Sequence, residues 1–298
     1  MVSEDGRWGA TVIAFVGTVF SPWYFAARAA AAKRGDPPPP AERFCGFNVA
    51  IYGPNRHWWA LTERATATVH REARRLTVGP DTFGWEGDEV VISFDMQTMP
   101  FGGPVRGKIR LKPRMLPAQR LEIAPGHTWQ PVAPAGEAEV VLDEPKVRFA
   151  GHAYHDANDG TEPLEAAFSR WCWARATDAA GTTVIYDVED RAAAPRGFAA
   201  HFSNTGDMAF VDAPRRVTLP HGFWWRVPRS TRAAADADVR LVRTLEDTPF
   251  YTRSQLEIRT PGNVAAAVHE SLDLERFVSP WVQFLLPFRI RNEALKRL

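Results

Sequence analysis

The feature that most restricts the fold is a series of short segments in which apolar and polar residues alternate. A period of two places the apolar side chains on one face of an extended strand. Turn-forming groups such as Gly53-Pro54-Asn55 separate these segments, as is typical of antiparallel sheets joined by hairpins. The predicted strands cover residues 11–20, 47–52, 58–62, 89–94, 107–111, 137–142, 147–150 and 184–188.

Two helices are predicted among these strands. An Ala-rich helix over 23–34 would end at Gly35, with prolines beyond it. A second helix over 162–175 would begin after Thr161, with Pro163 in its first turn. An all-β chain of 298 residues more often forms two cores than one. We therefore predict an all-β protein of two antiparallel domains with short helical insertions.

The boundary between these domains is placed by the stretch from 126 to 136, which is rich in Pro and Gly. Alternating strands resume at Glu137 directly after it. The predicted domains are therefore residues 1–135 and 136–298.

Composition excludes several classes of protein. The net charge is +1 and the basic residues are scattered among acids, which argues against a nucleic-acid partner. The two cysteines, Cys45 and Cys172, have no second cysteine or histidine at ligand spacing, so we expect neither zinc nor a disulfide framework. The apolar stretch from 11 to 32 is interrupted by Pro22 and Arg28 and does not predict a membrane span. We expect a reduced, cytoplasmic protein.

Two short pairs near the predicted boundary gather polar and aromatic groups. His127 and Trp129 form an HxW pair, and Tyr154 and Asp156 form a YxD pair. Residues two apart on a strand point to the same face, so each pair presents its two side chains together. If both strands line one cavity, a carboxyl, an imidazole, a phenol and an indole converge.

This group suits protonation of an isolated carbon–carbon double bond. Burial raises a carboxyl pKa and keeps the acid protonated, and aromatic faces stabilise a carbocation without trapping it. The competing interpretation is that such pairs fill a core or form turns, which are their commoner roles.

Other candidate sites are less well supported. A glycosidase carboxylate pair of Asp156 with Asp187 or Glu165 lacks any sequence feature that sets the distance between the two carboxylates. The charged run with Arg243, Glu246, Asp247 and Arg253 favours an ion-pair network that braces a strand and turn.

Motifs of serine hydrolases, nucleotide-binding proteins and zincins are missing from the sequence. Longer segments are more informative: 14–24 (AFVGTVFSPWY), 47–54 (FNVAIYGP), 62–64 (TER), 243–251 (RTLEDTPFY), 269–272 (HESL) and 279–281 (SPW). Together they resemble the acyclic carotenoid 1,2-hydratases, also called hydroxyneurosporene synthases, in one register from about residue 5 to about residue 290.

The resemblance implies addition of water across the terminal C1–C2 double bond of an acyclic carotenoid such as neurosporene or lycopene, without cofactor or metal. It also implies a pair of lipocalin-like barrels, as in tocopherol cyclase-like and Diels–Alderase-like proteins. In the family the acid is the Asp of the YxD element, assisted by its Tyr and by the HxW pair. These positions match Asp156, Tyr154, His127 and Trp129 of this chain.

Three features of the sequence depart from the family pattern. An aromatic-rich strand expected before Asp5 is missing, so the first barrel is expected to close differently or to lack that strand. Cys172 stands where an acidic residue is expected between two tryptophans, and His155 stands where an aromatic residue is common. On a regular strand His155 points away from Asp156, so the predicted site is unaffected.

Two rival functions keep the same fold. One is a carrier of a lipophilic ligand, and the other is a cyclase that uses the same acid to start ring closure. A carotenoid is insoluble in water, so we expect peripheral contact with the inner membrane surface. The tail over 277–290 could contact lipid through Trp281, Phe284 and Phe288, or it could form a strand and a buried turn.

Overall fold

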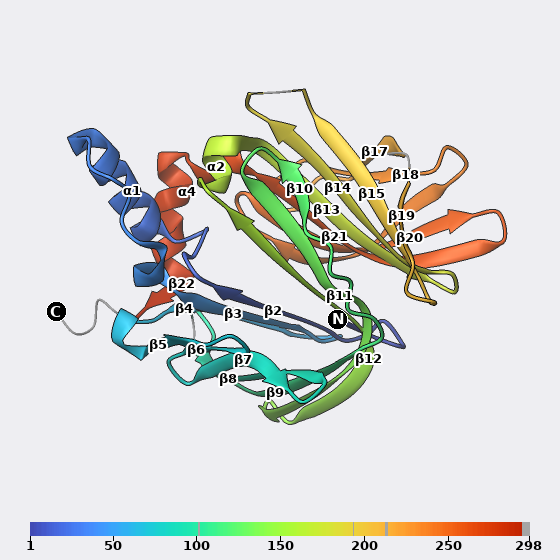
Figure 1. Ribbon diagram of the computed structural model, residues 1–298, viewed down its shortest axis with the longest axis horizontal. Helices are drawn as coiled ribbons and strands as arrows, with labels where there is room; N and C mark the ends of the chain where they lie inside the picture. The colour runs from blue at the N-terminus through green and yellow to red at the C-terminus, as the bar shows by residue number, and fades with distance from the viewer. Residues whose placement is uncertain (101, 193, 212–213, 294–298) are drawn as a thin grey trace. The chain divides into compact units, whose positions relative to one another are not determined.

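The computed structural model describes residues 1–298 except 101, 193, 212–213 and 294–298 (Figure 1). Over the described residues the strands form sheets of thirteen, seven and two strands, with few helices between them. The predicted all-β class is therefore confirmed. Contacts divide the chain into two compact units. The first comprises Met1–Pro113, Gly136–Tyr154 and Gln283–Leu298, and the second comprises Arg114–Ala135 and His155–Val282.

The first unit is built from hairpin-connected strands, as the alternating pattern predicts. All seven residues of β3 are buried, which requires cover on both faces of this strand. Trp8 stacks on Phe149 and on Trp58 with ring centroids 5.5 and 6.5 Å apart, and these rings add to the core. The strands are β1 (Val2–Ser3), β2 (Gly9–Phe15), β3 (Gly46–Tyr52), β4 (His57–Glu63), β5 (Val69–Arg71), β6 (Arg75–Val78), β7 (Asp81–Glu86), β8 (Glu89–Gln97) and β9 (Pro104–Pro113).

Helix α1 (Pro22–Arg34) confirms the predicted Ala-rich helix. Ser21 caps its start, since the Ser21 hydroxyl accepts a hydrogen bond from the Tyr24 backbone N–H at 3.0 Å. Gly35 ends it in the left-handed conformation with φ of 72°, which glycine adopts without steric cost. Two 3₁₀ turns follow in the same unit, η1 (Ala41–Phe44) and η2 (Thr66–Thr68).

Glu63, at the end of β4, is a buried carboxyl whose titration should affect stability. Burial raises its pKa from 4.5 to about 7 and outweighs the hydrogen bonds from Ser21, Thr18 and Asn292. Between these two values the folded protein holds the proton more tightly than the unfolded chain. The free energy of unfolding should therefore fall as the pH rises from 4.5 to about 7, by about 3 kcal/mol for this group.

Urea unfolding at a series of fixed pH values measures this loss. Glu63→Gln keeps a neutral side chain at every pH and should flatten the decline in that window. A Glu63→Gln variant with the wild-type pH dependence would show that another group is responsible.

Two long strands follow, β11 (His127–Glu144) and β12 (Val147–Gly160). β11 begins at His127 and runs without interruption past residue 136, so the prediction that a new strand starts at Glu137 is wrong. The Pro and Gly residues are tolerated because β11 changes partner: β10 (Leu121–Ala124) pairs with its first residues and β9 with its last. β11 passes from the second unit to the first between Ala135 and Gly136. The domains 1–135 and 136–298 stay a prediction.

The second unit is centred on the seven-stranded sheet, in the order β16-β15-β14-β13-β21-β20-β19 (Figure 1). A separate hairpin of β17 and β18 belongs to the same unit. The strands are β13 (Phe168–Asp178), β14 (Gly181–Asp190), β15 (Arg196–Ser203), β16 (Met208–Val211), β17 (Arg215–Leu219), β18 (Arg229–Ala233), β19 (Asp238–Asp247), β20 (Tyr251–Thr260) and β21 (Asn263–Asp273).

The helix predicted over 162–175 is wrong for most of its length. Only one turn, α2 (Leu164–Ala167), is helical, and β13 begins at Phe168. β13 pairs along its length with β14 on one side and β21 on the other. The backbone hydrogen bonds to β14 and β21 satisfy the N–H and C=O groups of β13. This pairing outweighs the local sequence signal for the start of a helix.

The tail of the chain forms α3 (Leu274–Phe277), α4 (Pro280–Leu285), the 3₁₀ turn η3 (Leu286–Phe288) and β22 (Ile290–Asn292). β22 pairs in parallel with β4. Phe277 and Val282 are buried, whereas Phe284 and Phe288 are exposed by 69% and 58%. Over the described residues, no helix is long and apolar enough to cross a membrane.

Candidate active site

Three of the four predicted site residues belong to the second unit. His127 and Trp129 lie on β11, where they share one face, and Asp156 lies near the end of β12. Tyr154 precedes Asp156 by two residues on β12 and so shares its face of that strand. The contact clustering assigns Tyr154 to the first unit.

The Asp156 carboxyl is half-buried, and one of its oxygens accepts hydrogen bonds from two neutral side chains. The Trp129 indole Nε1 donates to Asp156 Oδ2 at 3.0 Å, and the Asn158 side-chain amide donates to the same oxygen at 3.3 Å. Two hydrogen bonds to Oδ2 keep this oxygen an acceptor. The structure thus brings Trp129 into contact with Asp156.

The orientation of the Asn158 amide is fixed by Tyr186. The Tyr186 hydroxyl, on β14, donates to Asn158 Oδ1 at 3.2 Å, which leaves the amide N–H groups on the side of Asp156. Burial raises the pKa of Tyr186 well above its ordinary value, and the nearby Asp156 charge raises it further. Tyr186 therefore stays protonated and acts as a donor. Neither Asn158 nor Tyr186 was among the predicted site residues.

An aromatic cluster surrounds the indole that binds Asp156. Trp129 is fully buried, and its ring centroid lies 5.2 Å from that of Tyr186 and 6.0 Å from that of Phe198. Tyr186 also stacks on Phe198 at 5.1 Å and meets Trp171 edge-on at 5.5 Å. These ring faces give the surroundings of Asp156 the low polarity and the π-electron density that stabilise a nearby cation.

The His127 ring packs beside this cluster. It meets Phe168 edge-on at 4.9 Å, and a methyl group added at Gly160 would lie 2.5 Å from His127 Nδ1. Only glycine at position 160 allows this approach of β12. His127 Nε2 has no hydrogen-bond partner among the described residues, and burial lowers the pKa of this histidine. The ring is therefore held neutral at the edge of the site.

His155 follows Tyr154 and points to the opposite face of β12 from Asp156, as the alternation predicts. Burial lowers the pKa of His155 to about 4, so this ring is neutral at physiological pH.

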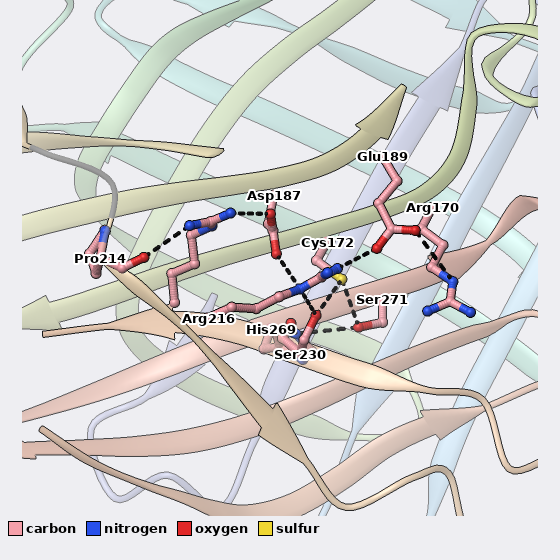
Figure 2. A network of polar contacts seen from close by, with 10 residues as sticks. Arg170, Cys172, Asp187, Glu189, Pro214, Arg216, Ser230, His269 and Ser271 are labelled. Atoms are coloured by element: carbon pink, nitrogen blue, oxygen red, sulfur yellow. Dashed lines mark hydrogen bonds and ion pairs between the residues drawn. The ribbon is translucent and has the colours of Figure 1, made fainter. Parts of the chain in front are cut away.

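A second group of polar side chains lies inside the same unit (Figure 2). Cys172 Sγ is 3.3 Å from Ser271 Oγ, and His269 Nε2 is 3.4 Å from that hydroxyl. His269 Nε2 is also 2.8 Å from the Ser230 carbonyl oxygen, and burial lowers the pKa of His269 to about 4. The neutral ring therefore donates through Nε2 to the carbonyl and cannot accept a proton from Ser271 through that atom. This group is not a nucleophile and base pair.

The structure also shows the surroundings of Asp187 and of the two cysteines. Asp187, an alternative partner for Asp156, is engaged by Arg216 and Arg232 at 2.9 and 2.8 Å. Cys45 and Cys172 are both buried free thiols. Within the part of the chain that the structure describes, no three His, Cys, Asp or Glu side chains are grouped as metal ligands.

A family model described as carotenoid hydratase CrtC matches residues 12–297. The chain belongs to this family. The resemblance stated from the sequence is thereby confirmed.

Curated relatives of this carotenoid hydratase family include acyclic carotenoid 1,2-hydratases of three bacteria. The protein of Thiocapsa roseopersicina is 43% identical over 291 residues, covering 97% of this chain and 70% of that protein. The protein of Rubrivivax gelatinosus is 39% identical over 296 residues, with coverage of 98% and 72%. The protein of Cereibacter sphaeroides is 33% identical over 282 residues, with coverage of 94% and 97%.

Solved structures of similar fold were also found. A putative AttH from Nitrosomonas europaea has a TM-score of 0.63 at 12% identity and covers 91% of this chain and 89% of its own. CghA, in a crystal structure with Sch210972, has a TM-score of 0.60 at 14% identity, with coverage of 91% and 86%. At these identities the likeness concerns the fold alone, and it confirms the predicted lipocalin-like architecture.

Proposed function

We propose that this protein hydrates the terminal C1–C2 double bond of an acyclic carotenoid, with Asp156 as the general acid. The observation that carries the proposal is the hydrogen bond from the Trp129 indole to Asp156 Oδ2, within an aromatic cluster. Membership of the carotenoid hydratase family supports a carotenoid as the molecule that this carboxyl protonates. Neurosporene and lycopene are substrates of the right chemistry because each ends in an isolated trisubstituted double bond.

The reaction begins with a proton transfer from the Asp156 carboxyl to C2. The π electrons of the double bond form the new C–H bond, and a tertiary cation is left at C1. Trp129, and Tyr154 on the same face of β12 as the acid, stabilise this cation by cation–π attraction, worth about 2 kcal/mol or more in a desolvated site. Neither ring is a nucleophile that would trap the cation.

Water then adds to C1 and loses a proton, which restores the Asp156 carboxyl through solvent. The atoms balance as alkene plus water giving a tertiary alcohol, with no change of oxidation state. We therefore propose a reaction without cofactor or metal. His127 has a neutral ring with an unpartnered Nε2 and is suited to orient the attacking water.

The test is the mass of the product formed when the purified chain acts on lycopene in detergent micelles. Hydration should add the mass of one water per reacted end. In D₂O followed by washing with H₂O, the product should retain one deuterium on carbon at C2 for each end. A product of unchanged mass would indicate the cyclase alternative, and unchanged substrate that remains bound would indicate the carrier alternative.

We also propose that the substrate is taken up at a membrane surface, since a carotenoid partitions into bilayers. The exposed rings of Trp281, Phe284 and Phe288 in the tail support such a peripheral contact. On this proposal the protein acts at the inner face of the cytoplasmic membrane.

A further inference from the structure

The second unit contains a cavity that the hydration proposal does not use. Its volume is about 170 Å³, several times the share of one water molecule in the liquid. Strands β13, β17, β18 and β21 and the segment between β17 and β18 supply its lining. The charged or titratable side chains in this lining are Arg170, Cys172, Arg216, His221, Arg229 and Asp273.

The arginines next to the cavity outnumber their carboxylate partners. Arg216 lies 2.9 Å from Asp187 and 2.7 Å from Glu189 (Figure 2). Arg170 lies 3.7 Å from the same Glu189, and Arg232 lies 2.8 Å from the same Asp187. Three guanidinium groups therefore share two carboxylates.

Arg229 adds a fourth guanidinium, and it is 2% exposed. Its Nη1 donates to the hydroxyls of Thr244 and Ser254 at 3.0 Å each, and its Nε has no partner. Among the residues that the structure describes, no carboxylate lies within ion-pair distance of Arg229, although the charge of the nearby Asp247 carboxylate partly offsets the effect of burial on the Arg229 pKa. The lining carboxylate Asp273 is paired with Arg276 at 3.5 Å. A buried cation whose direct partners are neutral hydroxyls is a strong attractant for an anion.

An aromatic loop, residues 220–228, adjoins this cavity and connects β17 to β18. His221 and Pro228, near its two ends, line the cavity. Between them the side chains of Phe223 and Trp224 are 75% and 78% exposed. Neighbouring apolar rings with so much exposed area are typical of binding surfaces and are less common on the remaining surface of a soluble protein.

The backbone of the aromatic loop is nevertheless firmly held. The Trp224 N–H donates to Asp247 Oδ2 at 2.7 Å, and Arg276 Nη1 donates to the Trp225 carbonyl at 2.6 Å. The Trp225 ring stacks on Trp281 with centroids 5.9 Å apart. The rings are therefore presented outward on a fixed support, so that binding through them costs little ordering of the backbone.

We propose that the cavity binds the phosphate headgroup of an anionic phospholipid while the aromatic loop inserts into the bilayer interface. Arginine groups bind phosphate oxygens in paired hydrogen bonds, and Trp and Phe partition to the interface beside the headgroups. A protein partner would explain the exposed rings but not the buried cation beside them. The inference rests on the proposed function. It adds the class of lipid that the protein binds and the residues that hold it at the bilayer containing its substrate.

The test uses the full chain and co-sedimentation with phosphatidylcholine vesicles, with and without phosphatidylglycerol and free of carotenoid. The double variant Phe223→Ser with Trp224→Ser should lower the partition coefficient about tenfold or more. The matched control is Phe210→Ser, on β16 and 64% exposed, which should bind as the wild type does. Equal binding by the double variant would overturn the role of the loop. Because no carotenoid is present, this readout is independent of whether the protein hydrates one.

The headgroup site is tested by removing one charge at two places. Arg170→Gln, at a side chain 43% exposed, should lower binding to phosphatidylglycerol vesicles about fivefold. Arg106→Gln, at a side chain 49% exposed in the first unit, removes the same charge and should have little effect. Equal losses in the two variants would mean attraction by overall charge, which overturns a specific cavity.

Inorganic phosphate separates a lipid headgroup from a free anion. Phosphate should raise the melting temperature of the wild type more than that of Arg170→Gln, and phosphatidylglycerol vesicles should compete with it. Stabilisation by phosphate without any vesicle binding would identify a site for a free anion and overturn the lipid proposal. Vesicle binding that phosphatidylglycerol does not strengthen would overturn the headgroup site.

Discussion

The Asp156→Asn variant is expected to lose hydration activity by a factor of about 10²–10⁴ while it remains folded. The amide oxygen of Asn can still accept the hydrogen bond from Trp129, so the arrangement of the site should persist. What the variant lacks is the acidic proton that must be delivered to C2. The measurement is turnover of lycopene, followed by the appearance of the hydrated product.

Asp159→Asn is the matched control for this substitution. Asp159 lies three residues further along β12, where it bonds to Arg120 and to Thr128 and is exposed. Its loss should leave turnover within about twofold of the wild type, since surface contacts of this kind contribute little. Wild-type turnover by Asp156→Asn would remove this carboxyl from the mechanism, whereas equal losses in both variants would point to damage of β12.

The strands could be predicted from the sequence because their signal is local. Alternation with a period of two follows from strand geometry, and it located β3, β4, β8 and β14 to within a few residues. The failed helix at 162–175 shows the limit of such signals. Its start was supported by Thr161 and Pro163, but the partners that make Phe168–Asp178 a strand are β14 and β21, which no local pattern identifies.

The candidate site was predicted in part for the same reason. Period two puts His127 with Trp129 on one face, and the contact of Trp129 with Asp156 agrees with that expectation. Asn158 continues the same alternation beyond Asp156 and could have been included. Tyr186 could not, because only the pairing of β14 within the second unit brings its hydroxyl to Asn158.

The charged cavity of the second unit was not predicted at all. Its arginines come from β13 and from the later hairpin of β17 and β18, and each alone resembles an ordinary surface residue. Only their common position beside two carboxylates reveals an excess of positive charge. By contrast, the ion-pair network predicted for Arg243, Glu246, Asp247 and Arg253 is confirmed in part, since Arg253 pairs with Glu246.

This network is a row of three charges across neighbouring strands. Arg253, on β20, stands directly opposite Glu246 on β19 and Glu270 on β21. Its guanidinium lies 3.0 Å from the first carboxylate and 2.9 Å from the second. Arg253 is 2% exposed, so these contacts are shielded from water and salt. Loss of the arginine would leave two carboxylates with like charge beside each other.

We therefore expect Arg253→Met to lower the free energy of unfolding by about 3–5 kcal/mol, measured by urea denaturation. Arg259→Met is the control on the same strand, because Arg259 is exposed and pairs with Glu257 at 2.7 Å, a contact worth about 0–1 kcal/mol. Adding Glu246→Gln and Glu270→Gln to Arg253→Met should recover much of the loss, since the unpaired charges are then gone. A triple variant no more stable than Arg253→Met would mean that packing of the arginine stem, rather than its charge, stabilises the three strands.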